Sequence, residues 1–491
     1  MTVLINQSEL LRLSSVESSA GNYRAAREYV LRASAHTIRN PVVARQIIER
    51  LRVFNEVEAL KRYLHLLGPI ECMPIPLLLS CAAQFVYLGE LDNALRYIDE
   101  ARRGDPEFPP TLLARGQTLM YHGRFDEARA EVMHCLKRAP ELAHGWWLLS
   151  RIDRQTEQSN HVAGIRAQLH RPGRRNDEIA LLQYALHKEL DDLGDYDGAW
   201  RALEQACRRK RETAQYDVED NRRLFDDLIA FPVAQSIAGH PRGAGATPLF
   251  IVGMHRSGTT LLEQLLDGSP NVKGIGEVYD FASAMRYATN RFSRGVTDRA
   301  IVERAKGIDF TEVGKRYQDS MAWRLGDEQF FTDKLPSNFL NIGFICRALP
   351  HAKMLHMVRD PVETCFSNLR ELFSDANPYS YSQMELAEYY LQYHRLMAHW
   401  HGAYPGRILD VQYADLARDP ETVMRKVADF CGVDFVPEMA DSRSSTRAVA
   451  TASSVQVRQS VTRRDTPRYV PYLHQMQPLI EALRGGLSGD A

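Results

Sequence analysis

Leu249-Phe-Ile-Val252-Gly-Met-His-Arg-Ser-Gly-Thr-Thr260-Leu-Leu-Glu-Gln-Leu-Leu266 sets the architecture of the second half of the chain. Its first four residues form a short apolar run before a glycine, which is typical of a buried strand, and its last six are predicted to begin a helix. In a strand, loop and helix of this order, backbone N–H groups and the helix N-terminus converge on one point and favour a bound anion. The sequence therefore predicts a phosphate-binding loop.

This loop differs from that of a nucleoside triphosphatase at one position. Gly253 and Gly258 have the G-x-x-x-x-G spacing, but Thr259 stands where a Walker A motif has lysine. That lysine contacts the outer phosphates of ATP. A nucleoside triphosphatase is therefore disfavoured, while a phosphotransferase on the same P-loop architecture stays an alternative.

The composition is that of an ordinary globular protein. Of the 491 residues, 44% are apolar and 25% are charged, and a chain of this length folds into roughly two to four domains. The 61 Lys and Arg residues nearly balance the 62 Asp and Glu residues, which leaves a formal net charge of −1. This balance gives no reason to expect binding to nucleic acid or to an anionic membrane.

Three features predict a cytoplasmic protein without membrane insertion. The first ten residues, MTVLINQSEL, lack the basic and apolar regions of a signal peptide. The most apolar stretch, Met73 to Leu88, contains two prolines and falls short of the roughly 20 apolar residues of a membrane helix. The seven cysteines are scattered without C-x-x-C spacing, which indicates a reducing compartment and predicts neither a zinc site nor a redox site.

The first half of the chain contains a sequence repeat. Gly89-Glu-Leu-Asp-Asn-Ala94 recurs 34 residues later as Gly123-Arg-Phe-Asp-Glu-Ala128, and each copy has a proline 17 residues after its glycine. Weaker copies begin at Gly21, Asn55 and Gly194. A glycine tolerates the positive φ of a tight turn between two helices, and the small alanine lets the second helix approach the first.

The 34-residue period resembles the tetratricopeptide repeat. We predict an N-terminal all-α tetratricopeptide-like solenoid over residues 1–238, followed over residues 246–491 by the domain that contains the phosphate loop. A solenoid has a concave surface, which suits a protein or peptide partner. The alternative interpretation is that the repeats only pack against the second domain.

Three further segments follow the phosphate loop at informative spacings. One lies 21 residues beyond Arg256, one is an apolar run that ends in a lysine and a proline, and one is a predicted strand followed by arginine and, eight residues later, serine. In order, they are Gly276-Glu277, Phe330-Phe-Thr-Asp-Lys334-Leu-Pro336, and Lys353-Met-Leu-His-Met-Val358 with Arg359-Asp-Pro361 and Ser367.

Together with His255-Arg-Ser-Gly-Thr-Thr260, these segments resemble the sulfotransferases that use 3′-phosphoadenosine 5′-phosphosulfate (PAPS), in particular the tyrosylprotein branch. The tandem arrangement is similar to tetratricopeptide-repeat sulfotransferases. The resemblance implies an α/β fold with a central parallel sheet. It also implies transfer of a sulfuryl group from PAPS to a hydroxyl or amine, without a metal.

The resemblance assigns a role to individual residues. It implies that Glu277 is the catalytic base, and that Lys334, supported by Arg256, stabilises the leaving oxygen of the donor. The remaining implied donor contacts are Arg256, Ser257, Gly258, Thr259 and Thr260 at the 5′-phosphosulfate, Arg359 and Ser367 at the 3′-phosphate, and Arg458 and Arg463 in a C-terminal basic segment.

Some alternatives stay open at this stage. Glu277 is also interpretable as an acid that interacts with a helix N-terminus, and His255 as a different base. The whole second domain is alternatively a silent nucleotide-binding domain of a repeat-based adaptor. The acceptor is a protein tyrosine, a glycan or a small molecule, because residues 279–329 carry no recognisable motif.

Overall fold

The computed structural model describes residues 6–233, 245–373, 375–441 and 466–488, and the expected donor contacts Arg458 and Arg463 lie outside these ranges. The chain divides into two compact units. Among the described residues, unit 1 comprises 6–139 and 279–323, and unit 2 comprises 140–278, 324–441 and 466–488.

Both units are discontinuous in sequence. Tyr279–Trp323, from the second half of the chain, belongs to unit 1, and the part of the predicted repeat domain that starts at Pro140 belongs to unit 2. The predicted domain boundary between residues 238 and 246 stays a prediction. Each compact unit combines segments from both halves of the chain, so the units do not correspond to the two predicted domains.

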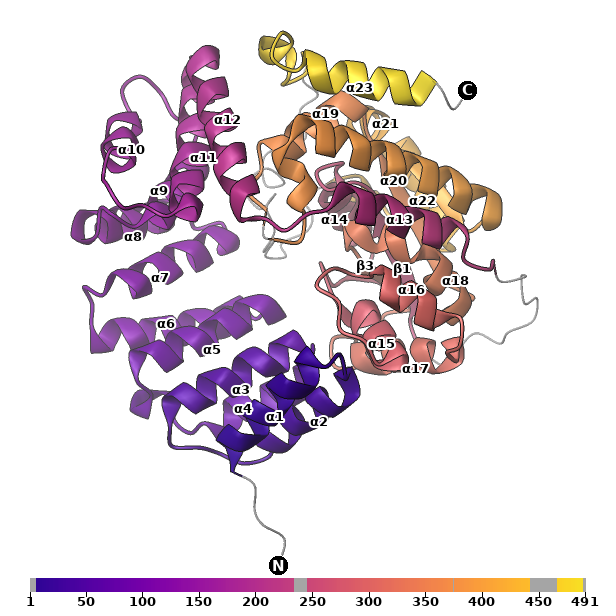
Figure 1. Cartoon of the computed structure of the whole chain (residues 1–491), viewed down its shortest axis with the longest axis horizontal. Coiled ribbons are helices and arrows are strands. Elements are labelled where there is room, and N and C mark those ends of the chain that lie inside the picture. Colours follow the sequence, from indigo (N-terminus) through magenta and orange to yellow (C-terminus); the bar gives the residue numbers. More distant parts are fainter. Residues whose placement is uncertain (1–5, 234–244, 374, 442–465, 489–491) are drawn as a thin grey trace, which may run out of the picture. The chain divides into compact units, whose positions relative to one another are not determined.

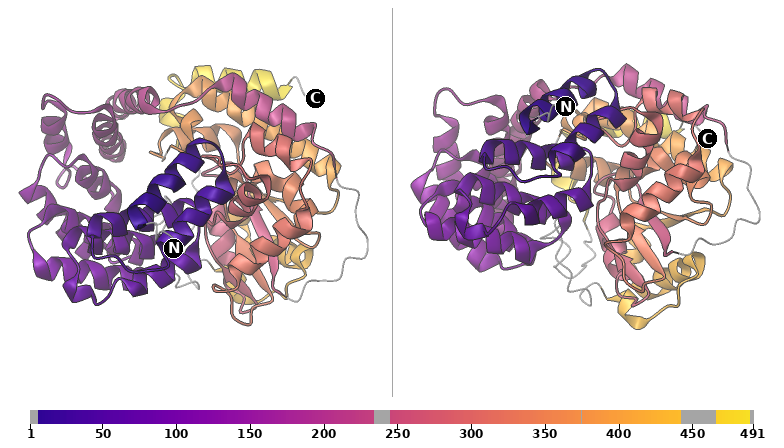
Figure 2. Two further views of the ribbon diagram at one scale, coloured as in Figure 1. Left: turned by 60° about the horizontal axis from the view of Figure 1, so that its bottom comes forward. Right: turned by 90° about the horizontal axis from the view of Figure 1, so that it is seen from below.

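Unit 1 begins with paired helices (Figure 1). Figure 2 shows these helices, coloured indigo to violet, following one another along the chain. They are α1 (Gln7–Ser19), α2 (Tyr23–Ala33), α3 (Pro41–Val53), α4 (Val57–Leu66), α5 (Ile75–Leu88), α6 (Leu91–Gly104), α7 (Pro109–His122) and α8 (Phe125–Arg138).

The turn between the helices of a pair explains the sequence repeat. Gly89, at the C-terminal end of α5, has a φ of 77°, and Gly123, at the C-terminal end of α7, has a φ of 82°. Both residues adopt the left-handed conformation that glycine tolerates. Asn55, the substitute in a weaker copy, has a φ of 56°. Ala94 and Ala128 are fully buried. The predicted all-α repeat architecture is therefore confirmed.

Unit 1 also contains three helices from the second half of the chain, α15 (Asp280–Thr289), α16 (Arg299–Ala305) and α17 (Phe310–Met321). Arg24 of α2 donates hydrogen bonds to the backbone carbonyls of Tyr287 (2.8 Å) and Ala288 (2.7 Å) at the end of α15. Tyr287 also packs against the apolar core of the repeats. No sequence motif predicted this contact.

Unit 2 combines helices with one parallel sheet. Its N-terminal helices are α9 (Ala143–Ile152), α10 (Val162–Leu169), α11 (Asn176–Leu193), α12 (Tyr196–Thr213) and α13 (Val218–Ile229). Over the described ranges the sheet has the parallel strand order β2-β3-β1-β4-β5. Its strands are β1 (Thr247–Val252), β2 (Val272–Gly274), β3 (Phe330–Asp333), β4 (Lys353–Val358) and β5 (Ile408–Gln412).

Helices cover both faces of this sheet, as strands buried on both faces require. Leu249 and Ile251 join the apolar cluster that includes α14 (Thr259–Leu266), α21 (Tyr413–Arg418) and α22 (Pro420–Cys431). His356, which alternates with two members of that cluster along β4, instead contacts Tyr393 of α20 (Gln383–Ala403). The predicted α/β fold with a central parallel sheet is confirmed. Among the described residues, no helix has the length and apolar character needed to cross a membrane.

We expect Gly116→Ala to destabilise unit 1. A Cβ at position 116 would lie 2.5 Å from Cγ2 of Val132 and 3.2 Å from the Ala128 carbonyl, so α7 and α8 would have to separate. Such overpacking costs about 1–3 kcal/mol of the free energy of unfolding, which urea denaturation measures.

The matched control is Gly104→Ala. There the added Cβ would lie 3.5 Å from Cδ1 of Ile75, an ordinary contact, at the end of α6. We expect this variant to be as stable as the unmodified protein or more so, since alanine favours a helix over glycine. Equal effects at both positions would contradict the tight packing of α7 on α8.

Candidate functional site

The predicted phosphate loop joins β1 to α14, and its backbone explains its glycines. Gly253 has a φ of +147°, and a Cβ there would lie 2.7 Å from the Met357 carbonyl. Gly258 has a φ of +110°, and a Cβ there would lie 2.5 Å from the ring of Tyr413. Arg256 has a φ of 66°, an uncommon value for a residue with a side chain. Such conformations occur often at functional sites.

Buried hydroxyl groups line the same loop. The Ser257 side chain is 1% exposed, and its Oγ has no hydrogen-bond partner among the described residues. Thr259 and Thr260, also buried, are the first two residues of α14, whose N-terminus has no side-chain cap. A buried hydroxyl without a partner costs about 1–3 kcal/mol. A phosphate oxygen at this helix N-terminus would remove that cost.

A cluster of arginines surrounds Arg256. The Arg256 Nη1 atom lies 3.9 Å from Oε2 of Glu371, and Oε1 of Glu371 accepts a 2.5 Å hydrogen bond from Nη1 of Arg151 on α9. Burial lowers the pKa of Arg256, Glu371 raises it, and the neighbouring charges of Arg151, Arg359 and Arg370 lower it. The site therefore concentrates positive charge, which an anionic ligand would offset.

The structure brings Arg359 to the phosphate loop. Its Nη1 donates a 3.2 Å hydrogen bond to the carbonyl of Arg256, its Nε pairs with Glu363 at 3.1 Å, and its guanidinium lies 4.6 Å from the centroid of the Tyr413 ring. Ser367 lies half-buried on α19 (Pro361–Leu369), the helix that follows Arg359. Among the described residues, no hydrogen bond joins Ser367 to Arg359.

Lys334 and Glu277 form an ion pair. The Nζ of Lys334 donates a 2.7 Å hydrogen bond to Oε1 of Glu277, and the Lys334 backbone N–H donates to the Gly276 carbonyl at 3.1 Å. The Lys334 side chain is fully buried, whereas that of Glu277 is 39% exposed. The two candidate catalytic residues are therefore adjacent, with the carboxylate at the solvent side of the pair.

The same contacts keep Glu277 ionised. Loss of solvent would raise the pKa of Glu277, but the charge and hydrogen bond of Lys334, with smaller effects of His255 and Arg256, bring the pKa below its usual value. The carboxylate thus carries its charge at neutral pH and loses it only as the pH falls through that lowered pKa. An ionised carboxylate is the form that accepts a proton.

Glu263 holds the backbone next to Glu277, a role that the sequence analysis missed. Its buried Oε1 accepts hydrogen bonds from the Gly276 backbone N–H (2.7 Å) and the Thr332 hydroxyl (3.3 Å). The sequence feature that could have indicated this role is a carboxylate within the apolar helix after the phosphate loop. A buried carboxylate of this kind needs hydrogen-bond partners.

Asn368 on α19 also supports the loop and was not predicted. Its Nδ2 donates a 2.7 Å hydrogen bond to the His255 carbonyl. The His255 ring lies against Phe373, and its Nδ1 is 3.3 Å from the Tyr379 hydroxyl. Burial lowers the pKa of His255 to about 4, so its imidazole is neutral at pH 7.

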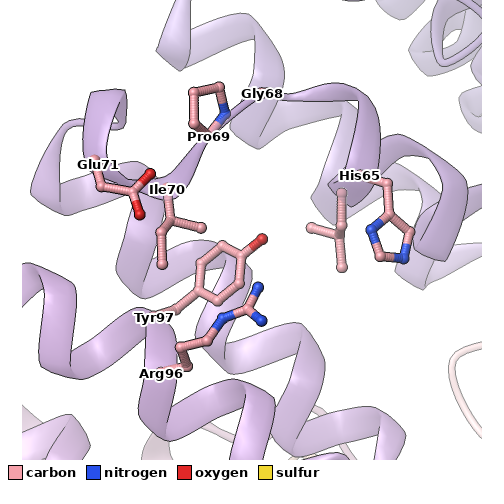
Figure 3. A pocket seen from close by; sticks show the side chains of 8 residues that line it. His65, Gly68, Pro69, Ile70, Glu71, Arg96 and Tyr97 are labelled. Atoms are coloured by element: carbon pink, nitrogen blue, oxygen red, sulfur yellow. The ribbon is translucent and has the colours of Figure 1, made fainter.

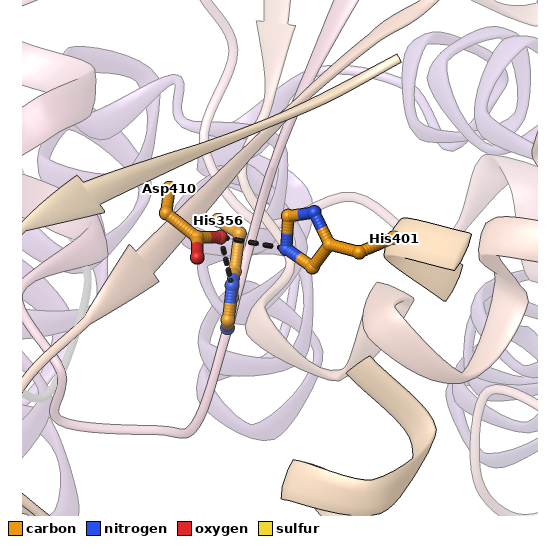
Figure 4. A group of neighbouring side chains, drawn as sticks. All are labelled: His356, His401 and Asp410. Carbon is orange, nitrogen blue, oxygen red and sulfur yellow. Dashed lines mark hydrogen bonds and ion pairs between the residues drawn. The ribbon is translucent and has the colours of Figure 1, made fainter. Parts of the chain in front are cut away.

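His356, Asp410 and His401 form a second polar cluster (Figure 4). Oδ1 of Asp410 is hydrogen bonded to both histidine rings at 2.8 Å, and the other nitrogen of His356 bonds the Tyr393 hydroxyl. The three possible ligand atoms lie within 4.8 Å of one another. The hydrogen bonds explain the arrangement, which links β4 and β5 to α20.

The repeats of unit 1 contain a pocket of about 410 Å³ (Figure 3). It lies among α4, α6 and the short helix η1 (Ile70–Cys72), and Tyr97, Arg96 and Glu71 are among the residues that line it.

Residues 248–437, in the second half of the chain, match the model of the sulfotransferase family. The predicted resemblance is confirmed for this segment. The chain is 28% identical over 318 residues to an uncharacterized protein of Aquifex aeolicus (strain VF5), covering 62% of this chain and 41% of that protein. It is 24% identical over 210 residues to protein-tyrosine sulfotransferase 2 of Gallus gallus, covering 38% and 51%.

The chain thus spans about half or less of the length of these two relatives. Among solved structures, it is similar to the sulfotransferase domain of the Synechococcus PCC 7002 olefin synthase, with 20% identity and a TM-score of 0.32. That similarity covers 49% of this chain and 98% of the domain.

We expect Glu263→Ala to lower stability by about 1–3 kcal/mol, because the Gly276 N–H and the Thr332 hydroxyl would both lose their acceptor. Glu263→Gln keeps one side-chain oxygen and should lose less. Urea denaturation of both variants measures the difference. Equal losses would show that Glu263 does not act as this acceptor.

Proposed function

We propose that this protein is a sulfotransferase that moves the sulfuryl group of PAPS to an acceptor hydroxyl or amine. The observation that carries the proposal is the Lys334–Glu277 ion pair in the same unit as a phosphate loop whose buried Ser257 hydroxyl has no hydrogen-bond partner among the described residues. A proton acceptor and a buried cation are the two groups that sulfuryl transfer needs.

In the proposed reaction, the acceptor oxygen forms a bond to sulfur while the bond between sulfur and the bridging oxygen of the donor breaks. Glu277 takes the acceptor's proton, which the lowered pKa of this carboxyl permits at neutral pH. Lys334, with Arg256, stabilises the negative charge that develops on the leaving oxygen, by the same electrostatic principle as in phosphoryl transfer.

The donor assignment rests on two sets of residues. Ser257, Thr259 and Thr260, with the backbone of the loop, would hold the 5′-phosphosulfate, and the unpartnered Ser257 hydroxyl fits that group. Arg359, beside the loop, would hold the 3′-phosphate together with Ser367. The proposed reaction requires no metal.

The proposal extends to the acceptor and to the molecule that the repeats bind. Tyr279 follows Glu277 by two residues, and the segment that begins at Tyr279 belongs to unit 1 together with the first repeats. We propose that the repeats dock a protein or peptide, as an acceptor or as a partner of the enzyme. The protein is proposed to act in the cytoplasm.

The direct test of catalysis is transfer of ³⁵S from labelled PAPS to a panel of tyrosine peptides, oligosaccharides and small phenols. We expect the unmodified protein to label at least one class. Glu277→Gln should lower kcat by about 10²–10⁴-fold and leave binding of 3′-phosphoadenosine 5′-phosphate (PAP) nearly unchanged. A variant that transfers label at the original rate would remove Glu277 from the mechanism.

Arg359→Ala tests the 3′-phosphate contact. Loss of a charge-assisted hydrogen bond should weaken PAP binding by about 1.5–3 kcal/mol, as calorimetry measures. The control ligand is adenosine 5′-phosphosulfate, which lacks the 3′-phosphate and should lose little affinity. An equal loss of affinity for both ligands would show that Arg359 does not contact the 3′-phosphate.

A further inference from the structure

The last residue of α19 and the two residues after it contact three of the N-terminal helices of unit 2. The Tyr184 hydroxyl of α11 donates a 3.2 Å hydrogen bond to the Leu369 carbonyl. Arg370 pairs with Asp191 of α11 at 2.6 Å, and the Sγ of Cys207 on α12 contacts the same Leu369 carbonyl at 3.6 Å. The third helix is α9, whose Arg151 contacts Glu371 (2.5 Å). These helices therefore fix residues 369–371.

Glu371 connects α9 to the phosphate loop. Its side chain is 8% exposed, as is that of Arg256, and Arg151 is 20% exposed. Arg151 makes the closer contact, at 2.5 Å, while Arg256 stays 3.9 Å away. One buried carboxylate is thus shared by two guanidinium groups, one on a repeat helix and one on the loop.

This sharing has a consequence for Arg256. Its neighbours Arg151, Arg359 and Arg370 repel its charge, and the charge of Glu371 acts against that repulsion. Because Arg151 takes the direct contact with Glu371, the carboxylate can orient Arg256 without fully neutralising it. Arg256 then keeps its charge for an anion at the loop.

We propose that Glu371 and Arg151 are positioning residues for Arg256, so that a helix of the repeat array sets the donor affinity of the sulfotransferase site. This inference rests on the proposed function, because it assumes that the loop binds PAPS. Neither residue needs to touch the donor. Both act through the orientation and the charge of the Arg256 guanidinium.

Glu371→Gln distinguishes positioning from simple electrostatics. The substitution keeps the shape of the side chain and removes a negative charge near the loop. If Glu371 were only a nearby charge, its removal would strengthen the binding of an anionic nucleotide. If it positions Arg256, PAP binding weakens, and we expect a loss of roughly 2- to 30-fold, the range for residues that act through a network.

Calorimetric titration with PAP is the measurement, with the melting temperature of each variant as the test of folding. Arg151→Met should weaken PAP binding over the same range, and Arg151→Lys should restore part of it. The matched control is Arg154→Met, three residues further on, where the arginine is exposed. That control should bind PAP as the unmodified protein does.

Two further measurements separate this role from a merely structural one. Glu371→Gln should weaken the binding of PAP and of adenosine 5′-monophosphate by the same factor, because Arg256 acts at the 5′-phosphate that both ligands share. The double variant with Arg151→Met should lose less than the product of the two single losses, since both residues act through one arginine.

The outcomes are distinguishable. If the unmodified protein does not bind PAP, the proposed function fails and the inference fails with it. If it binds PAP, but Glu371→Gln binds equally well or more tightly at an unchanged melting temperature, the donor site stands and the positioning role is overturned.

Discussion

Buried positive charge beside the phosphate loop is the constraint around which unit 2 is organised. Guanidinium groups lose hydration when they are buried, and that loss is tolerated only where carboxylates and hydrogen bonds replace the water. Within the described part of unit 2, Arg359 pairs with Glu363, Arg370 with Asp191, and Arg151 and Arg256 share Glu371.

These four arginines and three carboxylates come from distant parts of the chain. Asp191 and Arg151 belong to helices of the predicted repeat region. The other five residues lie within residues 248–437, the segment that matches the sulfotransferase family. The charge balance of the site therefore needs both parts. These seven side chains carry one more positive than negative charge, which a bound anion would offset. Glu371 joins the two regions, because it contacts Arg151 of the repeat region and lies near Arg256 of the loop.

The sequence was sufficient for the parts of the fold that local pattern controls. The strand, loop and helix around Arg256 and the left-handed turns at Gly89 and Gly123 follow from residue type and spacing, because a positive φ or a close backbone contact admits few residues. The catalytic roles of Glu277 and Lys334 rest only on the family resemblance. The 2.7 Å ion pair between their side chains is a contact that the sequence did not predict.

The residues that support the site could not be predicted in the same way. Glu263, Glu371 and Arg151 are common residue types without a motif, and their roles depend on contacts between residues up to 220 positions apart. The grouping of Tyr279–Trp323 with the first repeats is also a long-range packing result. Periodicity and spacing describe neighbours along the chain, so they carry no information on such contacts.

We propose that the loop and its arginines form a site for a nucleotide with a phosphate at both the 5′ and 3′ positions. The most direct measurement is calorimetric titration of the unmodified protein with PAP, with ADP as the ligand that lacks the 3′-phosphate. The account predicts micromolar binding of PAP and at least about tenfold weaker binding of ADP, a difference of about 1.4 kcal/mol. Equal binding of both nucleotides, or binding of neither, would contradict it.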